Sequence, residues 1–343
     1  MSTNSSTSLP TINHVQTQGM ADAPPSNKPL VFIDKLSMTF AIPDVEHRKY
    51  VAGNLMDLPK EIGSGWQPAH GNRYKYAARF HLLDEGSNGV QSPWMTDYVM
   101  FQAAPFNGEG GFLRMEWNPA RFSETQRDGL FKMLDMHFDL PPPRVDEAKI
   151  TRADIAIDLP GVWIGDYVFE RAKSPIRTFV LHQGEPQTLY LGKQFHGQCR
   201  VYDKSAQQGD TTKELTRVEV CASPNRTAAQ LHTLLNPFKS IRVTELAKID
   251  LGIGEPHMRA LRRAIRAEGM AGPLNDFPSL ATLKHKAAIF AASAAVWDPL
   301  ALWKTWPAAI AAAFPSFGQP DHYGTVDGAM SVVQSIALHG VAL

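Results

Sequence analysis

The sequence predicts an α+β protein with a largely antiparallel sheet, followed by a mainly helical C-terminal domain. Short segments that alternate apolar and polar residues recur between residues 30 and 221, separated by turns containing Gly or Pro. Few helical patterns interrupt them. Beyond residue 236 the chain becomes rich in Ala, Leu and Arg and takes on helical periodicity.

Composition excludes several classes of protein. The 343 residues are enough for about two domains, and the 2 cysteines exclude a disulfide scaffold and fit a reducing cytosol. The 34 Lys and Arg balance the 34 Asp and Glu, so any contact with nucleic acid must be local. We expect a cytoplasmic protein with no membrane partner, because no apolar run reaches the roughly 20 residues of a spanning helix and no signal peptide is apparent.

The first two segments of the chain differ sharply in composition. Residues 1–28 are rich in Ser, Thr, Asn and Pro and predict a disordered tail. Residues 29–145 form an N-terminal α+β region, in which Ser123 and Gln126 have the spacing of a helix-capping box. Strands are expected at 30–40, 97–103 and 111–117. The sequence leaves open whether this region completes the sheet of the next one or stands apart.

Residues 146–236 contain most of the predicted strands. They are expected at 149–159, 178–182, 188–191, 198–203 and 216–221, with a short helix at 166–173. Residues 237–343 form the helical C-terminal domain. No internal repeat of useful period is apparent.

The strand at 151–158 has one apolar and one charged face. Side chains alternate along a strand, so Arg152, Asp154 and Asp158 share a face opposite an aliphatic one. Two carboxylates at this spacing repel unless a cation lies between them, and oxygen ligands suit Mg²⁺ or Mn²⁺. The alternative is an edge strand with its polar face in water.

The strand at 199–204 places a tyrosine between two cations. Arg200, Tyr202 and Lys204 share one face, and flanking positive charge favours the phenolate that a nucleophilic tyrosine needs. The alternative is a tyrosine whose ring packs on the sheet and whose hydroxyl is hydrogen-bonded.

The strand at 216–221 repeats this division into faces. Glu219 could supply a third oxygen ligand, and Arg217 could neutralise a phosphate. The alternative is an exposed ion pair between Arg217 and Glu219, which would be favoured if this strand were considered alone. Three strands of one region each place acids or bases opposite their aliphatic face, and this coincidence points to a functional site.

These strands also carry a recognisable order of motifs. The chain has T-R-x-D-x-x-x-D at 151–158, Y-x-G at 190–192, R-x-Y-x-K at 200–204 and R-x-E at 217–219. In this order they resemble the rolling-circle replication initiators of the plasmid Rep-trans type and their filamentous-phage relatives. The wider superfamily of such nickases uses a His-hydrophobic-His metal motif. None of the 12 histidines has that spacing, so carboxylates would replace it.

The resemblance implies that 146–236 is a DNA-nicking catalytic region and that the protein is a metal-dependent nicking-closing endonuclease. Tyr202 would attack one strand at the origin, leaving a 5′-phosphotyrosine and a 3′-hydroxyl primer, with Tyr190 as the rival nucleophile. The remaining implied roles are Asp154, Asp158 and Glu219 around Mg²⁺ or Mn²⁺, Arg200 and Lys204 in catalysis, and Arg152 and Arg217 on DNA. Implied partners are single-stranded or supercoiled origin DNA, a host helicase and polymerase, and a second copy in a homodimer.

A further basic stripe lies in the C-terminal region. It consists of Arg259, Arg262, Arg263 and Arg266, which fall on one helical face. Such a stripe can follow DNA phosphates or can simply be a solvated helix face. Two other functions remain open for the whole chain. It could be a non-catalytic origin- or operator-binding protein, or a structural or interaction protein whose polar strand faces are solvated.

Overall fold

The computed structural model describes most residues between 29 and 314. The predicted tail 1–28 and the chain end 315–343 lie outside the described residues, as do shorter internal stretches, chiefly 82–97 and 274–284.

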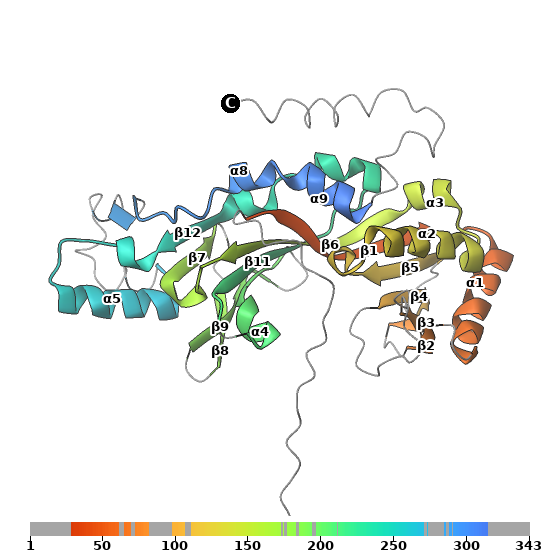
Figure 1. Ribbon diagram of the computed structural model, residues 1–343, viewed down its shortest axis with the longest axis horizontal. Helices are drawn as coiled ribbons and strands as arrows, with labels where there is room; N and C mark the ends of the chain where they lie inside the picture. Colours follow the sequence, from red (N-terminus) through yellow and green to blue (C-terminus); the bar gives the residue numbers. More distant parts are fainter. Residues whose placement is uncertain are drawn as a thin grey trace, which may run out of the picture.

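Strands dominate the described part of the chain (Figure 1). They are β1 (Val31–Ala41), β2 (Trp66–Pro68), β3 (Tyr74–Phe80), β4 (Val99–Pro105), β5 (Phe112–Trp117), β6 (Lys149–Pro160), β7 (Tyr167–Arg171), β8 (Arg177–His182), β9 (Glu185–Leu191), β10 (Cys199–Asp203), β11 (Leu215–Ala222) and β12 (Ile241–Glu245). The α-helices are α1 (Val45–Asp57), α2 (Glu124–Phe138), α3 (Pro142–Glu147), α4 (Lys204–Gln208), α5 (Glu255–Glu268), α8 (Pro299–Trp303) and α9 (Trp306–Ala313). The 3₁₀ helices are η1 (Leu58–Lys60), η2 (Pro119–Arg121), η3 (Ile164–Asp166), η4 (Ala228–Thr233), η5 (Pro237–Ser240) and η6 (Leu246–Lys248).

Ten of these strands form one antiparallel sheet. Their order is β2-β3-β4-β5-β1-β6-β11-β10-β9-β8, so β1 and β6 pair at its centre. The α+β prediction is confirmed. The region 29–145 completes the sheet of the region 146–236, because each supplies one side of the β1–β6 pair.

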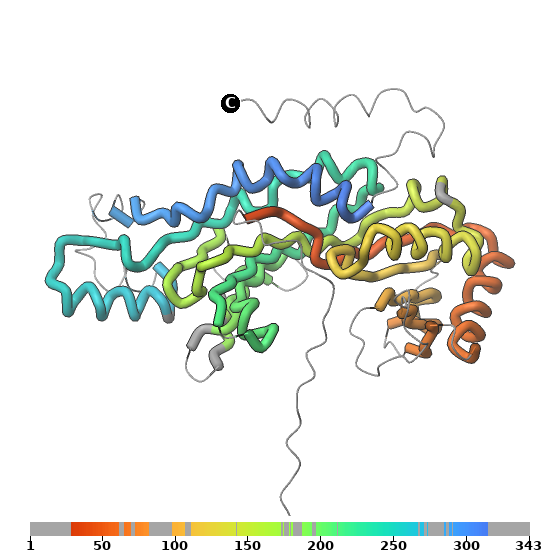
Figure 2. Tube along the Cα trace, viewed as in Figure 1, coloured from red at the N-terminus to blue at the C-terminus, as the bar shows by residue number. Residues whose placement is uncertain are grey.

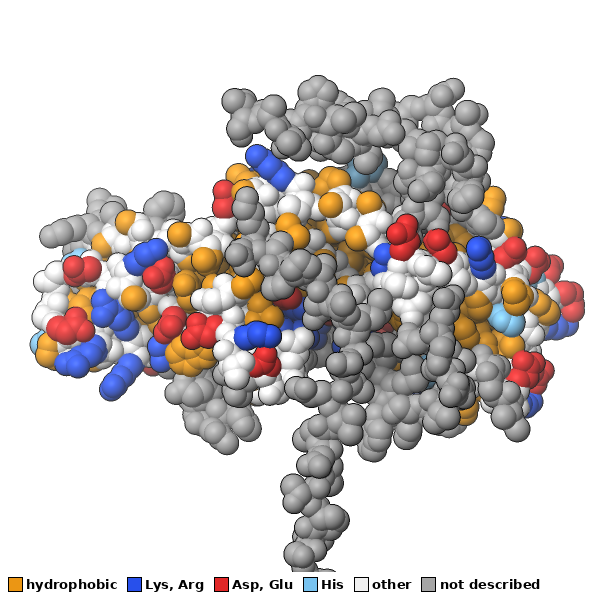
Figure 3. Space-filling view, viewed as in Figure 1, with side chains coloured by type: hydrophobic (Ala, Val, Ile, Leu, Met, Phe, Trp, Pro, Cys, Tyr) orange, Lys and Arg blue, Asp and Glu red, His pale blue; other side chains and the backbone are white. Residues whose placement is uncertain are grey.

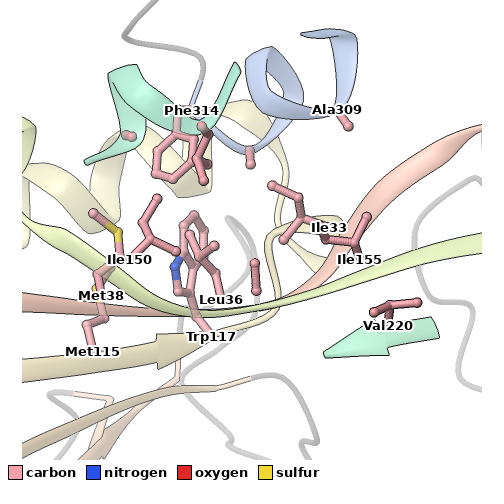
Figure 4. Packing of buried hydrophobic residues seen from close by; sticks show 14 of the residues in the cluster. Ile33, Leu36, Met38, Met115, Trp117, Ile150, Ile155, Val220, Ala309 and Phe314 are labelled. Atoms are coloured by element: carbon pink, nitrogen blue, oxygen red, sulfur yellow. The ribbon is translucent and has the colours of Figure 1, made fainter. Parts of the chain in front are cut away.

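The apolar face of the sheet is covered by helices from both ends of the chain. Met38, Met115 and Trp117 point from the central strands toward Phe314, which follows α9 (Figure 4). The backbone N–H of Val31 donates to Thr305 Oγ1 at 3.0 Å, which fixes the start of β1 beside α9. Burial of this contiguous apolar surface is the main stabilising contribution to the fold.

The region 237–314 is tied to the rest of the molecule. The chain trace shows α8 and α9 lying along the start of β1 (Figure 2). Its strand β12 pairs with β7, over residues where the sequence predicted a helix. That prediction is wrong because Val168 and Phe169 are both buried and their backbone is paired in a two-stranded sheet. Among the described residues, no helix has the length and apolarity needed to span a membrane.

Candidate active site

The strand order brings the three charged strand faces together. Strand β11 lies between β6 and β10, and the register places Arg217 opposite both Asp158 and Tyr202. Glu219 lies opposite Arg200 in the same ladder. Paired residues in an antiparallel sheet share a face, so side chains from segments far apart in sequence meet at one surface.

Arg200, Tyr202 and Glu219 are among the residues that line a solvent-open pocket of about 420 Å³. Its lining residues are Asp34, Lys35, Arg152, Asp154, Gln187, Thr188, Tyr190, Arg200, Tyr202, Asp203, Gln207 and Glu219. Asp154 and Glu219 are only 1% and 2% exposed. This burial is inconsistent with charged strand faces that are simply solvated.

An alternating chain of guanidinium and carboxylate groups forms the base of the pocket. Arg152 Nε and Nη2 donate to the two oxygens of Asp154 at 2.8 and 2.6 Å. Arg200 Nη2 donates to Asp154 Oδ2 at 3.2 Å and also to Glu219 Oε1. Charge-assisted pairing of this kind offsets the cost of burying the two carboxylates.

A second ion cluster surrounds Arg217. Its Nε and Nη2 donate to Asp158 at 2.6 and 2.8 Å, and its Nη1 donates to Asp34 Oδ1 at 2.7 Å. Arg217 is 8% exposed, and its guanidinium lies 4.7 Å from the centroid of the Phe32 ring. Arg217 therefore holds two carboxylates within the protein, whereas the sequence suggested a contact to phosphate.

Asp34 is a pocket residue that strand alternation does not predict. A register shift between Ile33 and Lys35 leaves Asp34 as an extra residue in the β1–β6 ladder, so Asp34 and Lys35 both line the pocket. Such a bulge breaks the alternation of faces on which sequence reasoning depends. Two adjacent charged residues between apolar ones, as in Ile33-Asp34-Lys35-Leu36, are the signal that could have found it.

The surroundings of Tyr202 differ from the expectation. Its hydroxyl donates to Glu219 Oε2 at 3.4 Å. Burial raises the pKa of Tyr202 above its usual value, although Arg217 and Arg200 oppose this and Glu219 reinforces it. The prediction that flanking cations favour the phenolate is therefore wrong for this arrangement, because desolvation outweighs their attraction.

Lys204 is not part of the strand that carries Tyr202. It is the first residue of α4, whose N-cap is Asp203, and its Nζ donates to Gln207 Oε1 at 2.8 Å. Burial, with the charge of Arg217 adding to it, lowers the pKa of Lys204. The expected alternation ends at Asp203 because the backbone turns into a helix there.

Glu219 lies where it can accept a proton from Tyr202. Burial raises the pKa of Glu219 to about 7, with Asp154 adding to the effect and Arg200 opposing it. A carboxylate that exchanges a proton near neutral pH and contacts the tyrosine hydroxyl is suited to general-base chemistry.

The predicted carboxylate metal site does not fit the geometry. Arg200 lies between Asp154 and Glu219, and Asp158 is bound to Arg217 instead of joining them. Within the part of the chain that the structure describes, no three His, Cys, Asp or Glu side chains are grouped to hold a metal ion. The two carboxylates between which a cation was predicted are paired with different guanidinium groups, Asp154 with Arg152 and Arg200 and Asp158 with Arg217.

The rival nucleophile lines the same pocket. Tyr190 is half-buried on β9 and lies opposite Arg200 in the β9–β10 ladder. Hydrogen-bond geometry distinguishes the two tyrosines, because the hydroxyl of Tyr202 contacts Glu219.

The four arginines of the predicted basic stripe separate into two pairs on α5. Arg262 donates to the carbonyl of Ile249 at 2.9 Å, and Arg266 lies 5.4 Å from the ring of Trp163. Figure 3 shows Lys and Arg side chains gathered at the end of the molecule where α5 lies. Of the four, Arg259 and Arg263 are exposed, whereas Arg262 and Arg266 are half-buried.

The chain is similar to a solved structure at the level of its backbone, but no protein-family model and no curated protein matches it. A rolling circle replication initiator protein from Geobacillus stearothermophilus aligns with a TM-score of 0.36 and 14% identity, covering 70% of this chain and 97% of that one. Similarity at this level leaves the chemistry of the site to be judged from its own residues.

Proposed function

We propose that the chain is a rolling-circle replication initiator that nicks one strand of origin DNA through Tyr202. The observation that supports this most directly is the contact between the Tyr202 hydroxyl and Glu219 inside a polar pocket bordered by Arg152 and Arg200. The strands that form the pocket carry the initiator-like motifs in the expected order.

The chemistry proposed is transfer of a phosphodiester to tyrosine. Tyr202 Oη attacks phosphorus, its proton passes to Glu219, and the bond from phosphorus to the 3′ oxygen breaks. The products are a 5′-phosphotyrosine and a strand whose 3′ oxygen takes a proton from water. Attack by that 3′-hydroxyl on the tyrosyl ester reverses the reaction and closes the nick.

Arg152 and Arg200 would bind the scissile phosphate. The side chain of each is 34% exposed, so one edge of the guanidinium holds Asp154 while the remainder reaches the pocket. Positive groups fixed in position before the reaction stabilise the negative charge that develops on phosphorus. The dependence on Mg²⁺ or Mn²⁺ stays a prediction, as do the helicase, the polymerase and the dimer.

One observation favours the non-catalytic alternative, an origin- or operator-binding protein. The raised pKa of Tyr202 and the mutual pairing of the site's charges describe a resting arrangement that does not activate the tyrosine. In the catalytic proposal, Arg152 and Arg200 keep their ion pairs and contact the phosphate through the exposed part of each guanidinium.

The deciding experiment incubates supercoiled DNA of the parent replicon with protein and Mg²⁺ or Mn²⁺. We expect wild type and Tyr190→Phe to form a covalent DNA adduct, and Tyr202→Phe to bind DNA without forming it. EDTA in a parallel reaction tests the metal prediction. An adduct formed by Tyr202→Phe would reject the proposed nucleophile, and a wild type that never nicks would favour the binding protein.

A further inference from the structure

The central sheet consists of two halves with the same topology. Outward from β1 the strands are β5, β4, β3 and β2, and outward from β6 they are β11, β10, β9 and β8. In chain order, each half begins with its strand at the centre of the sheet, β1 or β6. It ends with the strand that pairs with that one, β5 or β11 (Figures 1 and 2). An approximate two-fold axis therefore passes between β1 and β6.

Strand register and sequence agree with this relation. Strand β5 carries Arg114-Met115-Glu116 and β11 carries Arg217-Val218-Glu219, the same R-x-E pattern at the same place in the sheet. Each of the two halves then continues into a helix with a capping box. The capping pairs are Ser123 with Gln126 and Thr227 with Gln230.

Ladder positions identify the counterpart of each site residue. Gln102 lies opposite Arg114 as Tyr202 lies opposite Arg217, so Gln102 occupies the position of the nucleophile. By the same relation Met100 corresponds to Arg200, Lys35 to Asp154 and Thr39 to Asp158. The half formed by β1–β5 therefore keeps the R-x-E pattern, including the counterpart of Glu219. It lacks the tyrosine and the counterparts of Asp154 and Asp158, the other two predicted carboxylate ligands.

The first half keeps a polar cluster at this position. Glu116 accepts hydrogen bonds from Lys35 at 3.0 Å and Ser37 at 2.8 Å, and Arg114 pairs with both Glu116 and Gln102. Lys75 and Arg79 lie on the same face, because Arg79 is opposite Met100 and residues two apart on a strand point the same way. Four cations thus share this face with Glu116.

We propose that the half formed by β1–β5 is a second copy of the catalytic half that binds a DNA strand through its phosphates without cutting it. This inference rests on the proposed function, since it assumes that the chain acts on DNA. A phosphodiester backbone suits the excess of positive charge, and an amide in place of the phenol cannot attack phosphorus. Lys35 also lines the pocket of Tyr202, so the two surfaces are continuous.

The first test measures binding of a fluorescent single-stranded oligonucleotide to the full chain carrying Tyr202→Phe. Lys75→Gln should weaken binding and reduce the slope of log affinity against log salt by about 0.7, the effect of one lost phosphate contact on a single strand. Lys75→Arg should restore both. The matched control is Lys49→Gln, an exposed lysine on α1, which packs on the apolar face of β3 and β4. Equal affinity and slope for Lys75→Gln and Lys49→Gln would overturn the inference.

The second test does not depend on affinity. The photo-crosslinker p-benzoylphenylalanine replaces Gln102 or, as a control, Met136, which is 73% exposed on α2. We expect DNA capture at position 102 and none at 136. If wild type forms the tyrosyl adduct but position 102 captures nothing, this inference fails and the proposed function stands. If position 102 captures DNA while wild type never nicks, only the catalytic proposal fails.

Discussion

At the scale of single residues, Glu116 and Glu219 occupy equivalent positions and have opposite shifts in pKa. Burial disfavours the charged form of both, but Arg114 and Lys35 outweigh it and lower the pKa of Glu116 to about 2. Glu219 must share Arg200 with Asp154, and its pKa rises to about 7. Glu219 is the more deeply buried of the two, with 2% of its side chain exposed against 19% for Glu116, and it has fewer cations to itself. Both differences raise its pKa relative to that of Glu116.

This contrast predicts an acid-sensitive contribution from Glu116. Its folded pKa lies below the unfolded value of 4.5, so the stabilisation is complete above pH 5 and is lost as the pH falls toward 2. Glu116→Gln should lower the free energy of unfolding at pH 7 by roughly 3 kcal/mol and flatten its pH dependence below pH 5. Urea titrations between pH 3 and 7 measure both effects, with the exposed Glu46→Gln as control. If the free energy of unfolding falls equally steeply below pH 5 in wild type and in Glu116→Gln, this prediction is wrong.

Residue-level reasoning from the sequence succeeded where strand periodicity applies. The alternation of faces predicted that Asp154 and Tyr202 belong to charged faces, and the sheet order brings those faces together. Alternation gives no measure of how deeply a face is buried, so the sequence predicted the wrong direction of the Tyr202 pKa. It also does not indicate which carboxylate each arginine pairs with, and strict alternation overlooks the bulge at Asp34, which only the adjacent charges of Asp34 and Lys35 indicate.

At the scale of elements, the arginines of α5 lie in two kinds of surroundings. Met258, Leu261 and Ile265 bury its inner face, and Arg262 and Arg266 lie at the borders, where they bind neighbouring segments. Arg263 lies on the outer face. Sequence periodicity predicted the helix and its buried side. It could not predict that Arg262 binds the carbonyl of Ile249, outside the helix, or that Arg266 pairs with the distant Asp166.

Substitutions on α5 should therefore separate binding from stability. Arg263→Gln should leave the melting temperature unchanged and reduce the salt slope of duplex binding by about 0.9. Arg266→Gln loses the stack on Trp163 and the pair with Asp166, and should lower stability by about 1 kcal/mol. Thermal melts and salt-dependent anisotropy measure the two effects. Identical binding by wild type and Arg263→Gln would show that this face does not contact DNA.

At the scale of the whole molecule, one apolar core joins both halves of the sheet to the helices near residue 314. Trp306 is buried against it, and its Nε1 donates to the carbonyl of Leu231 at 3.0 Å. A helical C-terminal region could be predicted from composition. Its packing across the central strands could not, because that depends on contacts between residues more than 200 apart, such as Val31 and Thr305.

A shared core predicts cooperative unfolding of both halves. Trp306→Ala should reduce the free energy of unfolding by about 3–5 kcal/mol, the usual cost of truncating a buried tryptophan. Urea unfolding followed by far-UV circular dichroism and by tryptophan fluorescence should give coincident transitions in wild type and variant. Two separate transitions, with only one shifted by the substitution, would show that the halves unfold independently.

The similarity of the two halves was not visible in the sequence. The spacing between equivalent residues differs from strand to strand, and α1 in one half is replaced by β7 in the other. The common features reduce to R-x-E and a capping box, which are too short to detect without the ladder register.

Lys35 and Asp154 face each other at the centre of the sheet, each being the counterpart of the other. Two identical subunits meeting on an exact dyad would have to place the same residue on both sides, lysine against lysine or aspartate against aspartate, and such like-charged pairs are destabilising. Joining the halves in one chain removes that restriction. Opposite charges can then meet on the axis, and one half can carry Gln102 at the position where the other carries Tyr202.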